Sequence, residues 1–238
     1  LKLGIAYDSW EALGLANEVM YFINVEATKA SEGLAIERGN FPEFQNSIYA
    51  NAGYSGMRNA TRTTIAPTGT ISLIAGCSSG IEPYFAYKYE HHGLEGKLGG
   101  GETWASEALR EICESGTLDL SKAKVAREIS PEWHIKMQAA FQEHVDNAVS
   151  KTVNLPNSAT VEDVDKAYRM AYDLGCMGIT VYRDGSREGQ VLTSSDGEEE
   201  DERRRLDSMG SGDSNSGDFT EQKVRPSILT SVSIKQPT

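Results

Sequence analysis

The sequence predicts an α/β fold, and two observations support this prediction. Short β-prone runs alternate along the chain with longer segments of helical periodicity, a pattern typical of strands buried between helices. The helical segments also carry start signals: Ser130-Pro131 opens one of them, and Thr160 with Asp163 forms a capping-box pattern before another. With 238 residues, the chain is long enough to form a domain with a sizeable core.

The first predicted element is a long helix. Asp8 is a favourable N-cap residue, Glu11 follows at the capping-box position, and Gly39-Asn40 ends the helix. Between these signals apolar residues recur at three- and four-residue steps, and we expect this stripe to pack in the core. Its members are Leu13, Ala16, Met20, Ile23, Ala27, Ala30 and Leu34.

The later elements are predicted from propensity, caps and periodicity. The predicted strands are residues 61–65, 84–89, 151–155 and 177–182. The predicted helices are residues 103–114, 130–149 and 160–174; the second buries Trp133, Met137, Ala140, Phe141 and Val145, and the third buries Val164, Ala167, Ala171 and Leu174. A loop over residues 41–56 is expected to be held by three aromatic side chains, Phe41, Phe44 and Tyr49.

Residues 66–83 carry the strongest indication of a binding site. A strand that delivers a turn to the start of a helix leaves backbone N–H groups unpaired beside a partial positive charge, so an anion fits there. Gly69 would let the backbone approach the anion, and the hydroxyls of Thr68, Thr70 and Ser72 would add donors. The alternative is an ordinary capped turn between a strand and a helix, because the segment lacks the lysine of a Walker loop.

Composition limits the expected partners and compartment. A net charge of −12 and a pI near 4.8 argue against nucleic acid and anionic membranes as partners, and no stretch approaches the length of a membrane span. Cys77, Cys113 and Cys176 form no C-x-x-C pair, so a reducing cytoplasm is the simpler setting. No metal site is predicted, because no cysteine or further histidine stands at ligand spacing from His91-His92.

The composition changes beyond Leu192. Residues 193–224 are rich in glycine, serine and acidic residues, and such a segment cannot bury enough apolar surface to offset its ordering entropy. We therefore expect a disordered linker there, after a domain that occupies residues 1–192. Residues 228–234 regain an alternating pattern, and residues 225–238 are expected to begin a further C-terminal region.

Six short blocks, in order along the chain, form a family signature. They are Tyr7-Asp8-Ser9, Asn59-Ala60-Thr61, Ser79-Gly80-Ile81-Glu82-Pro83, Ser130-Pro131-Glu132-Trp133-His134, Lys151-Thr152-Val153-Asn154-Leu155-Pro156 and Gly178-Ile179-Thr180-Val181-Tyr182-Arg183-Asp184-Gly185-Ser186. Together with residues 66–83, they resemble the ribonucleotide reductases, and their sequences are most similar to those of the adenosylcobalamin-dependent (class II) family. The likeness covers roughly residues 1–192.

The resemblance implies a fold, a substrate and a cofactor. Residues 1–192 would be the carboxyl-terminal portion of a ten-stranded α/β barrel that belongs to a longer protein. The phosphates of a ribonucleoside di- or triphosphate would be held by Pro67, Thr68, Gly69, Thr70, Ile71 and Ser72. The family also implies adenosylcobalamin, a thioredoxin-like reductant, a cytoplasmic location and assembly as a homodimer.

The radical chemistry of the family needs a residue that this chain lacks. In the family a thiyl radical forms on the cysteine of an Asn-x-Cys-x-Glu pattern, which is absent from this sequence, so the chain by itself is expected to be inactive. Cys77 and Cys176 do not match the radical or reducing cysteines of the family, and we expect both to be buried structural thiols. Glu82 is expected to be structural, either locking the loop through backbone N–H groups or capping the next segment.

The pair Val181-Tyr182 separates the subclasses of the family. Class I enzymes, which import their radical from a second subunit, carry two adjacent tyrosines on this late strand as a relay, whereas here the first is valine. The resemblance therefore favours an enzyme that converts ribonucleotides to deoxyribonucleotides with a radical made locally from adenosylcobalamin. Two alternatives stay open: a non-catalytic nucleotide- or phosphate-binding homologue, and a class I large subunit with a diverged relay.

Overall fold

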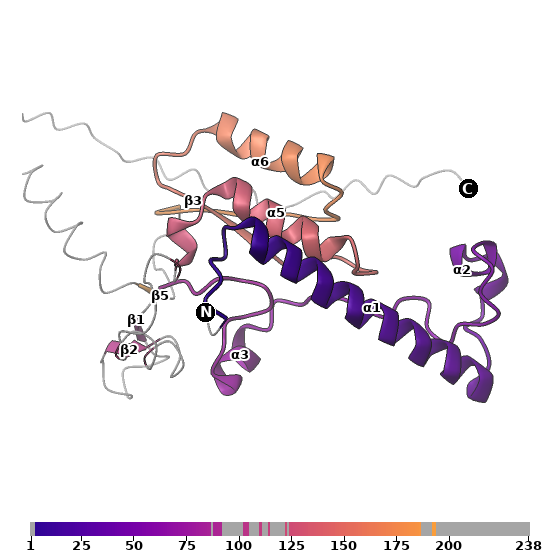
Figure 1. The fold of residues 1–238 in the computed structure, drawn as a ribbon. Coiled ribbons are helices and arrows are strands. Elements are labelled where there is room, and N and C mark those ends of the chain that lie inside the picture. Colours follow the sequence, from indigo (N-terminus) through magenta and orange to yellow (C-terminus); the bar gives the residue numbers. More distant parts are fainter. Residues whose placement is uncertain are drawn as a thin grey trace, which may run out of the picture. The chain divides into compact units, whose positions relative to one another are not determined.

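The computed structural model describes residues 3–86, 88–91, 102–104, 110, 114, 122, 124–186 and 192–193, and the structural statements below refer to these residues. The described chain combines helices and strands, which alternate from α5 to β4, in agreement with the predicted α/β class (Figure 1). All of the described residues belong to one compact unit, Leu1–Glu198. The predicted linker and C-terminal region lie outside the described residues, apart from Thr193.

The described elements are five helices, two short 3₁₀ turns and five strands. The helices are α1 (Trp10–Arg38), α2 (Ile48–Asn51), α3 (Gly69–Ala75), α5 (Pro131–Gln142) and α6 (Val161–Asp173), and the 3₁₀ turns are η1 (Phe44–Asn46) and η3 (Ala126–Glu128). The strands are β1 (Lys88–His91), β2 (Glu102–Trp104), β3 (Thr152–Leu155), β4 (Thr180–Arg183) and β5 (Leu192–Thr193). β3 and β4 pair in parallel, and β1 pairs antiparallel with both β2 and β5.

Helix α1 begins one residue later than the predicted cap implies. Ser9 is the N-cap, and its hydroxyl accepts a hydrogen bond from the Ala12 N–H at 3.1 Å. The prediction of Asp8 as the cap is wrong, because the Asp8 carboxylate binds the ammonium of Lys124 at 2.5 Å. Gly39 ends the helix as predicted, with a φ of +77° that favours glycine.

The buried face of α1 follows the predicted stripe only in the first half of the helix. Met20 is buried, as predicted, where α1 packs against α5. Further along, Ile23 and Ala30 are exposed, and Ser31 is buried instead. The reason is a change of neighbour: the hydroxyl of Ser31 accepts the N–H of Asn59 at 3.0 Å, so this part of the helix faces a loop.

Residues 41–56 form the predicted loop, which also contains η1 and α2. Phe44 is buried, and the ring of Phe41 stands edge-on to the rings of Phe44 and Tyr49, at centroid distances of 5.8 and 6.3 Å. Edge-to-face contacts of this kind add to the free energy gained by burying the rings. The prediction that aromatic side chains hold this loop is therefore confirmed.

The largest apolar cluster among the described residues surrounds the parallel strands β3 and β4. Its buried members are Ile135, Val153, Leu155, Ala167 and Ala171. Helix α6, which connects the two strands, carries the predicted capping box: the Thr160 hydroxyl accepts the Asp163 N–H, and the Asp163 carboxylate accepts the Thr160 N–H. Contrary to the prediction, Leu174 is exposed, because it lies beyond the last residue of the helix.

Helix α5 ends at Gln142, well before the predicted end at residue 149. The side-chain amide of Gln142 donates to the carbonyl of Asn147 at 2.8 Å, and that of Gln138 donates to the carbonyl of Val149 at 3.2 Å. These side chains satisfy carbonyls in a chain that turns back, so the helix does not continue. Of the predicted inward residues, Met137 and Val145 are buried, whereas Trp133, Ala140 and Phe141 are half-buried.

The strand predicted at residues 84–89 is displaced. β1 begins only at Lys88, because the backbone of Tyr84 is used elsewhere: its carbonyl accepts the Ala126 N–H at 2.8 Å. The extended run at residues 61–65 forms a single parallel bridge, between Ile65 and Val149.

The helix predicted at residues 103–114 is wrong at its start. Glu102–Trp104 form β2 and pair with β1, whereas Arg110 and Glu114 are helical. Pairing with a distant strand here overrides the local preference. Thr193, the first residue of the predicted linker, likewise pairs with β1.

Ile135 offers a test of the core, because its side chain lies in the main apolar cluster and is 1% exposed. Ile135→Ala should lower the free energy of unfolding by about 2–5 kcal/mol, since it removes buried methylenes and leaves a cavity. Denaturant titration would measure this change. Val161→Ala on α6 is the control, because Val161 is 80% exposed and its truncation should change stability by no more than about 0.5 kcal/mol.

His134 is a buried polar residue that the periodicity of α5 did not indicate. Its Nε2 lies 3.0 Å from the carbonyl of Ala126, and its side chain is fully buried. Burial lowers the pKa of His134 from 6.5 to about 4, and the charge of Lys151 adds to this effect. The imidazole is therefore neutral in the folded protein at neutral pH.

This pKa predicts how stability depends on pH. The unfolded chain protonates His134 near pH 6.5 and the folded chain only near pH 4, so the unfolded state binds more protons between these values. Stability should fall by up to about 3 kcal/mol as the pH is lowered through this window. Unfolding measured from pH 7 to pH 4 should show a smaller loss for His134→Gln, which keeps an N–H donor but cannot titrate. Equal pH dependence in the two proteins would contradict the prediction.

Candidate functional site

The predicted phosphate-holding residues, 67–72, lie where an extended segment enters a helix. The parallel bridge between Ile65 and Val149 precedes them, and Thr68 is the N-cap of α3. Thr68 has φ +52° and ψ 28°, which makes it the one described non-glycine residue in the left-handed region. This conformation costs a β-branched residue roughly 1–2 kcal/mol, so the surrounding contacts must hold it in place.

The first turn of α3 presents backbone donors to solvent. The first intrahelical bond runs from the Ser72 N–H to the Thr68 carbonyl at 2.9 Å, so the helix provides no acceptor for the N–H groups of Gly69, Thr70 and Ile71. All three residues are exposed, and a Cβ added to Gly69 would meet nothing within 4 Å. An anion can therefore approach this turn.

Two of the predicted hydroxyl donors hold the shape of the loop. The hydroxyl of Ser72 donates to the Gly69 carbonyl at 2.8 Å and lies 2.9 Å from the hydroxyl of Ser79. The hydroxyl oxygen of Thr68 accepts the N–H of Gly80 at 2.9 Å. Thr70 is exposed, and among the predicted hydroxyls it has the most open surroundings.

The segment that follows α3 and returns towards the loop, residues 79–82, lies close to the start of the loop. Gly80 has a φ of +51°, and a Cβ at this position would stand 3.1 Å from the carbonyl oxygen of Ala66. Only glycine combines this backbone conformation with such a close approach. Residues 79–80 therefore support the turn that carries the predicted phosphate-holding residues.

Glu82 connects the same returning segment to strand β3. Its Oε1 accepts the N–H of Thr152 at 2.5 Å, and its Oε2 pairs with the ammonium of Lys151, which also donates to the Thr152 carbonyl. The side chain of Lys151 is 0% exposed and that of Glu82 is 24% exposed. Binding to a backbone N–H agrees with the structural role predicted for Glu82.

Tyr7 closes this cluster from the amino-terminal segment. Its hydroxyl donates to the carbonyl of Ile81 at 2.8 Å. Burial raises the pKa of Tyr7 well above its usual value, and the charge of Glu82 adds to this, so the phenol keeps its proton. Burial lowers the pKa of Lys151, an effect that the Glu82 carboxylate opposes.

Lys151 and Tyr7 are site-supporting residues that the sequence analysis did not identify as such. Both stand in the family-like blocks, and Lys151 opens the run of residues 151–155 that was predicted to be a strand. A lysine at that position could have indicated a buried ion pair, because an ammonium group in a buried strand needs a carboxylate partner. The sequence did not indicate which of the acidic residues would supply it.

A second ion pair fixes the segment that leads into the loop. The guanidinium of Arg62 binds both carboxylate oxygens of Asp146, through Nε at 2.9 Å and Nη2 at 2.7 Å, and the Arg62 N–H binds the same carboxylate at 2.6 Å. Burial by itself would raise the pKa of Asp146, but the hydrogen bonds from Arg62 lower it below its usual value. This bidentate contact joins the run before the loop to the turn after α5.

The two described cysteines differ in exposure. Cys176 is partly buried against the main apolar cluster, and burial raises the pKa of its thiol, in agreement with a structural role. The prediction of a buried thiol is wrong for Cys77, which is exposed because it follows the left-handed Gly76 at the end of α3. Cys77 lies on the wall of a pocket of about 660 Å³ that Tyr7 and Glu82 also line.

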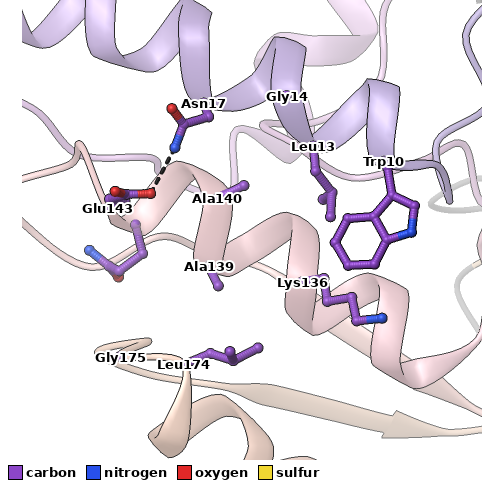
Figure 2. Close-up of a pocket in the computed structure, with 11 residues that line it drawn as sticks. Trp10, Leu13, Gly14, Asn17, Lys136, Ala139, Ala140, Glu143, Leu174 and Gly175 are labelled. Atoms are coloured by element: carbon purple, nitrogen blue, oxygen red, sulfur yellow. Dashed lines mark hydrogen bonds between the residues drawn. The ribbon is translucent and has the colours of Figure 1, made fainter.

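Another pocket, of about 670 Å³, lies between α1 and α5 (Figure 2). Figure 2 shows Trp10 and Lys136 towards one end and the hydrogen bond from Asn17 to Glu143, of 2.7 Å, towards the other. The ammonium of Lys136 stands over the rings of Trp10 and Trp133, at 5.0 and 4.6 Å from their centroids. Residues 67–72 do not line this pocket, so it is separate from the candidate phosphate site.

Among the described residues, no group of three or more His, Cys, Asp or Glu side chains is arranged to hold a metal ion. Within the described ranges, none of the helices has the length and apolar content that crossing a bilayer requires.

Comparison with known proteins identifies relatives of this chain. Residues 1–182 match the family model described as the ribonucleotide reductase barrel domain. The chain is 48% identical over 217 aligned residues to the vitamin B12-dependent ribonucleoside-diphosphate reductase of Thermoplasma acidophilum, an alignment that covers 82% of this chain and 28% of the relative. It is 47% identical to the enzyme of the same name from Mycobacterium tuberculosis strain CDC 1551, over 81% of this chain and 30% of that enzyme.

A solved structure supports the same fold. The chain resembles the alpha subunit of the class Id ribonucleotide reductase of Actinobacillus ureae with a TM-score of 0.60 and 24% identity, over 77% of this chain and 36% of that subunit. The family match covers most of the described elements, including α3, the Glu82–Lys151 pair and the β3–α6–β4 unit. The chain therefore belongs to the ribonucleotide reductase barrel-domain family.

Proposed function

We propose that the full-length protein is a ribonucleotide reductase that converts ribonucleotides to deoxyribonucleotides, and that this chain contributes the loop that binds the substrate phosphates. The relatives are named ribonucleoside-diphosphate reductases, and the chain spans less than a third of their length. Their name favours a diphosphate as the substrate form. The radical cysteine pattern is absent from these 238 residues, so the chemistry at the ribose is assigned to other parts of the protein.

The observation that carries this proposal is the geometry at the start of α3, in a chain of this family. The first-turn amides of Gly69, Thr70 and Ile71 have no acceptor within the helix, and the space in front of Gly69 is open. Backbone N–H groups in this arrangement bind phosphate oxygens. Pro67 and Thr68 set the direction of the turn, and the hydroxyl of Ser72 braces it.

Binding the phosphates contributes to catalysis by placing the ribose. A diphosphate held by several amides restricts the position of the attached sugar, which is remote from the phosphates. Binding energy from this part of the substrate can then be used to hold the ribose against the reacting cysteine. The role of this chain is thus to anchor and orient the substrate, and we place no proton or radical transfer on its described residues.

We also propose that the full-length protein depends on adenosylcobalamin, which would supply the initiating radical. The names of the relatives support this cofactor, and Val181 replaces one tyrosine of the class I relay. Two histidines in the described part of the chain are not suited to ligate a cobalamin: His134 is buried in the core, and the ring of His144 packs against Tyr21. We assign no cobalamin contact to the described residues.

The remaining expectations concern the assembly. The parallel β3–α6–β4 unit, with its buried apolar cluster, is the type of unit from which a ten-stranded α/β barrel is built. A thioredoxin-like reductant and assembly as a homodimer belong to the same proposal.

Gly69→Val in the full-length protein tests the phosphate site. A branched side chain here would block the approach of the anion, and losing one charge-assisted hydrogen bond, of about 1.5–3 kcal/mol, should raise KM for the ribonucleoside diphosphate roughly ten- to a hundredfold. Thr70→Ala should act in the same direction, with a smaller effect. Steady-state kinetics, with circular dichroism to confirm folding, would measure both.

Gly33→Val is the matched control for this experiment. Gly33 is an exposed glycine within α1, and a Cβ there also meets nothing within 4 Å. The control should leave KM unchanged. A folded Gly69→Val protein with an unchanged KM would mean that the turn is only a connection between a strand and a helix.

Dependence on the cofactor can be tested with the same full-length protein. Turnover should require adenosylcobalamin and no second subunit, because the tyrosine relay is interrupted at Val181. Product formation would be measured with adenosylcobalamin, with a cobalamin that lacks the adenosyl group, and with a metal-loaded class I small subunit. Turnover with the small subunit and without adenosylcobalamin would contradict this part of the proposal.

A further inference from the structure

We propose that Glu82 and Lys151 are positioning residues: their buried ion pair holds the phosphate loop in its binding conformation, a role that rests on the function proposed above. Neither side chain needs to touch the substrate for this role. The pair acts through the returning segment, residues 79–82, which contacts the loop on one side and strand β3 on the other.

The contacts form a continuous path from the strand to the loop. At the start of β3, the Thr152 N–H and the ammonium of Lys151, the residue just before the strand, bind the two oxygens of the Glu82 carboxylate. Two residues before Glu82, the Gly80 N–H binds the hydroxyl of Thr68, the strained N-cap of α3. The position of the carboxylate therefore constrains the backbone that supports Thr68.

Both carboxylate oxygens are used, which fixes the orientation of the Glu82 side chain. One oxygen binds a backbone amide, whose position is set by the pairing of β3 with β4, and the other binds a fully buried ammonium. The Lys151 ammonium is held in turn by the Thr152 carbonyl. A side chain bound at both oxygens to a strand has little freedom to rotate, so it transmits the position of the strand to the loop.

A role in stability alone does not explain the choice of these residues. A buried ion pair is often no more stabilising than apolar side chains of similar volume, because both charges lose their hydration. Charged partners that are hydrogen-bonded fix the orientation of the segment, whereas an apolar contact at the same place would allow it to shift. The left-handed Thr68 is the feature that requires such support, because its own conformation is unfavourable.

Two double variants of the full-length protein separate positioning from stability. Glu82→Gln/Lys151→Met removes both charges but keeps an oxygen that can accept the Thr152 N–H. Glu82→Leu/Lys151→Met removes both charges and the acceptor, so the segment loses its connection to β3. Neither variant leaves a charge buried without its partner.

The expected results concern the affinity for a ribonucleoside diphosphate and for the same ribonucleoside without phosphates, measured by calorimetry. Glu82→Leu/Lys151→Met should weaken diphosphate binding roughly tenfold, because a displaced loop loses about one phosphate contact. Affinity for the ribonucleoside should stay unchanged, and Glu82→Gln/Lys151→Met should bind both ligands like the unmodified protein. Asp165→Leu/Arg169→Met, which removes an exposed ion pair on α6, is the matched control and should change neither affinity.

Three outcomes would overturn the proposal. They are unchanged diphosphate affinity in a folded Glu82→Leu/Lys151→Met protein, an equal loss of affinity for both ligands, and an equal loss in the two Glu82–Lys151 double variants. If the leucine variant does not fold, Glu82→Asp decides: it keeps the charge pair but shortens its reach, and unchanged diphosphate affinity would then count against positioning. Gly69→Val distinguishes failure of the phosphate site from failure of the positioning role. If Gly69→Val leaves diphosphate binding unchanged, the phosphate site is refuted. If Gly69→Val weakens diphosphate binding and the Glu82 variants do not, only the positioning role is refuted.

Discussion

The carboxylate of Glu82 is the contact on which the arrangement of this site depends. It reaches from a returning loop to the backbone N–H of Thr152 and the buried ammonium of Lys151. Without a partner, that ammonium would be a buried charge, which folded proteins rarely tolerate. The pair therefore couples the conformation of residues 79–82 to the integrity of strand β3. Because Gly80 in turn contacts Thr68, the start of α3 is coupled to the same strand.

Similar connections from side chain to backbone recur throughout the structure. Gln138 bridges the carbonyls of Val149 and Gly178, which lie just before strands β3 and β4. The carboxylate of Asp146 holds both the side chain and the N–H of Arg62. Each contact satisfies a backbone group outside the helices and strands, so irregular segments also find partners for their hydrogen bonds. The loops around α3 are thereby connected to a sheet that, within the described residues, has two parallel strands.

Local signals accounted for much of the fold. Gly39 and Gly175 mark helix ends, and Thr160 with Asp163 opens α6, because caps depend on residues only a few positions apart. Periodicity failed where a helix changes its neighbour, as in α1 at Ser31, and where long-range contacts of buried glutamines end α5 early. Strand β2 replaced the start of a predicted helix, because pairing with β1 is a contact that no local pattern contains.

The site divides in the same way. By itself, the sequence determined the family, because the ordered motifs carry that information, and it indicated residues 67–72 as the expected phosphate loop. Only the tertiary structure decided that the hydroxyls of Thr68 and Ser72 brace the loop, that Cys77 is exposed, and that Lys151 is the partner of Glu82. The reason is distance along the chain: Glu82 and Lys151 are separated by 69 positions, and their meeting depends on how α3, the returning segment and β3 pack together.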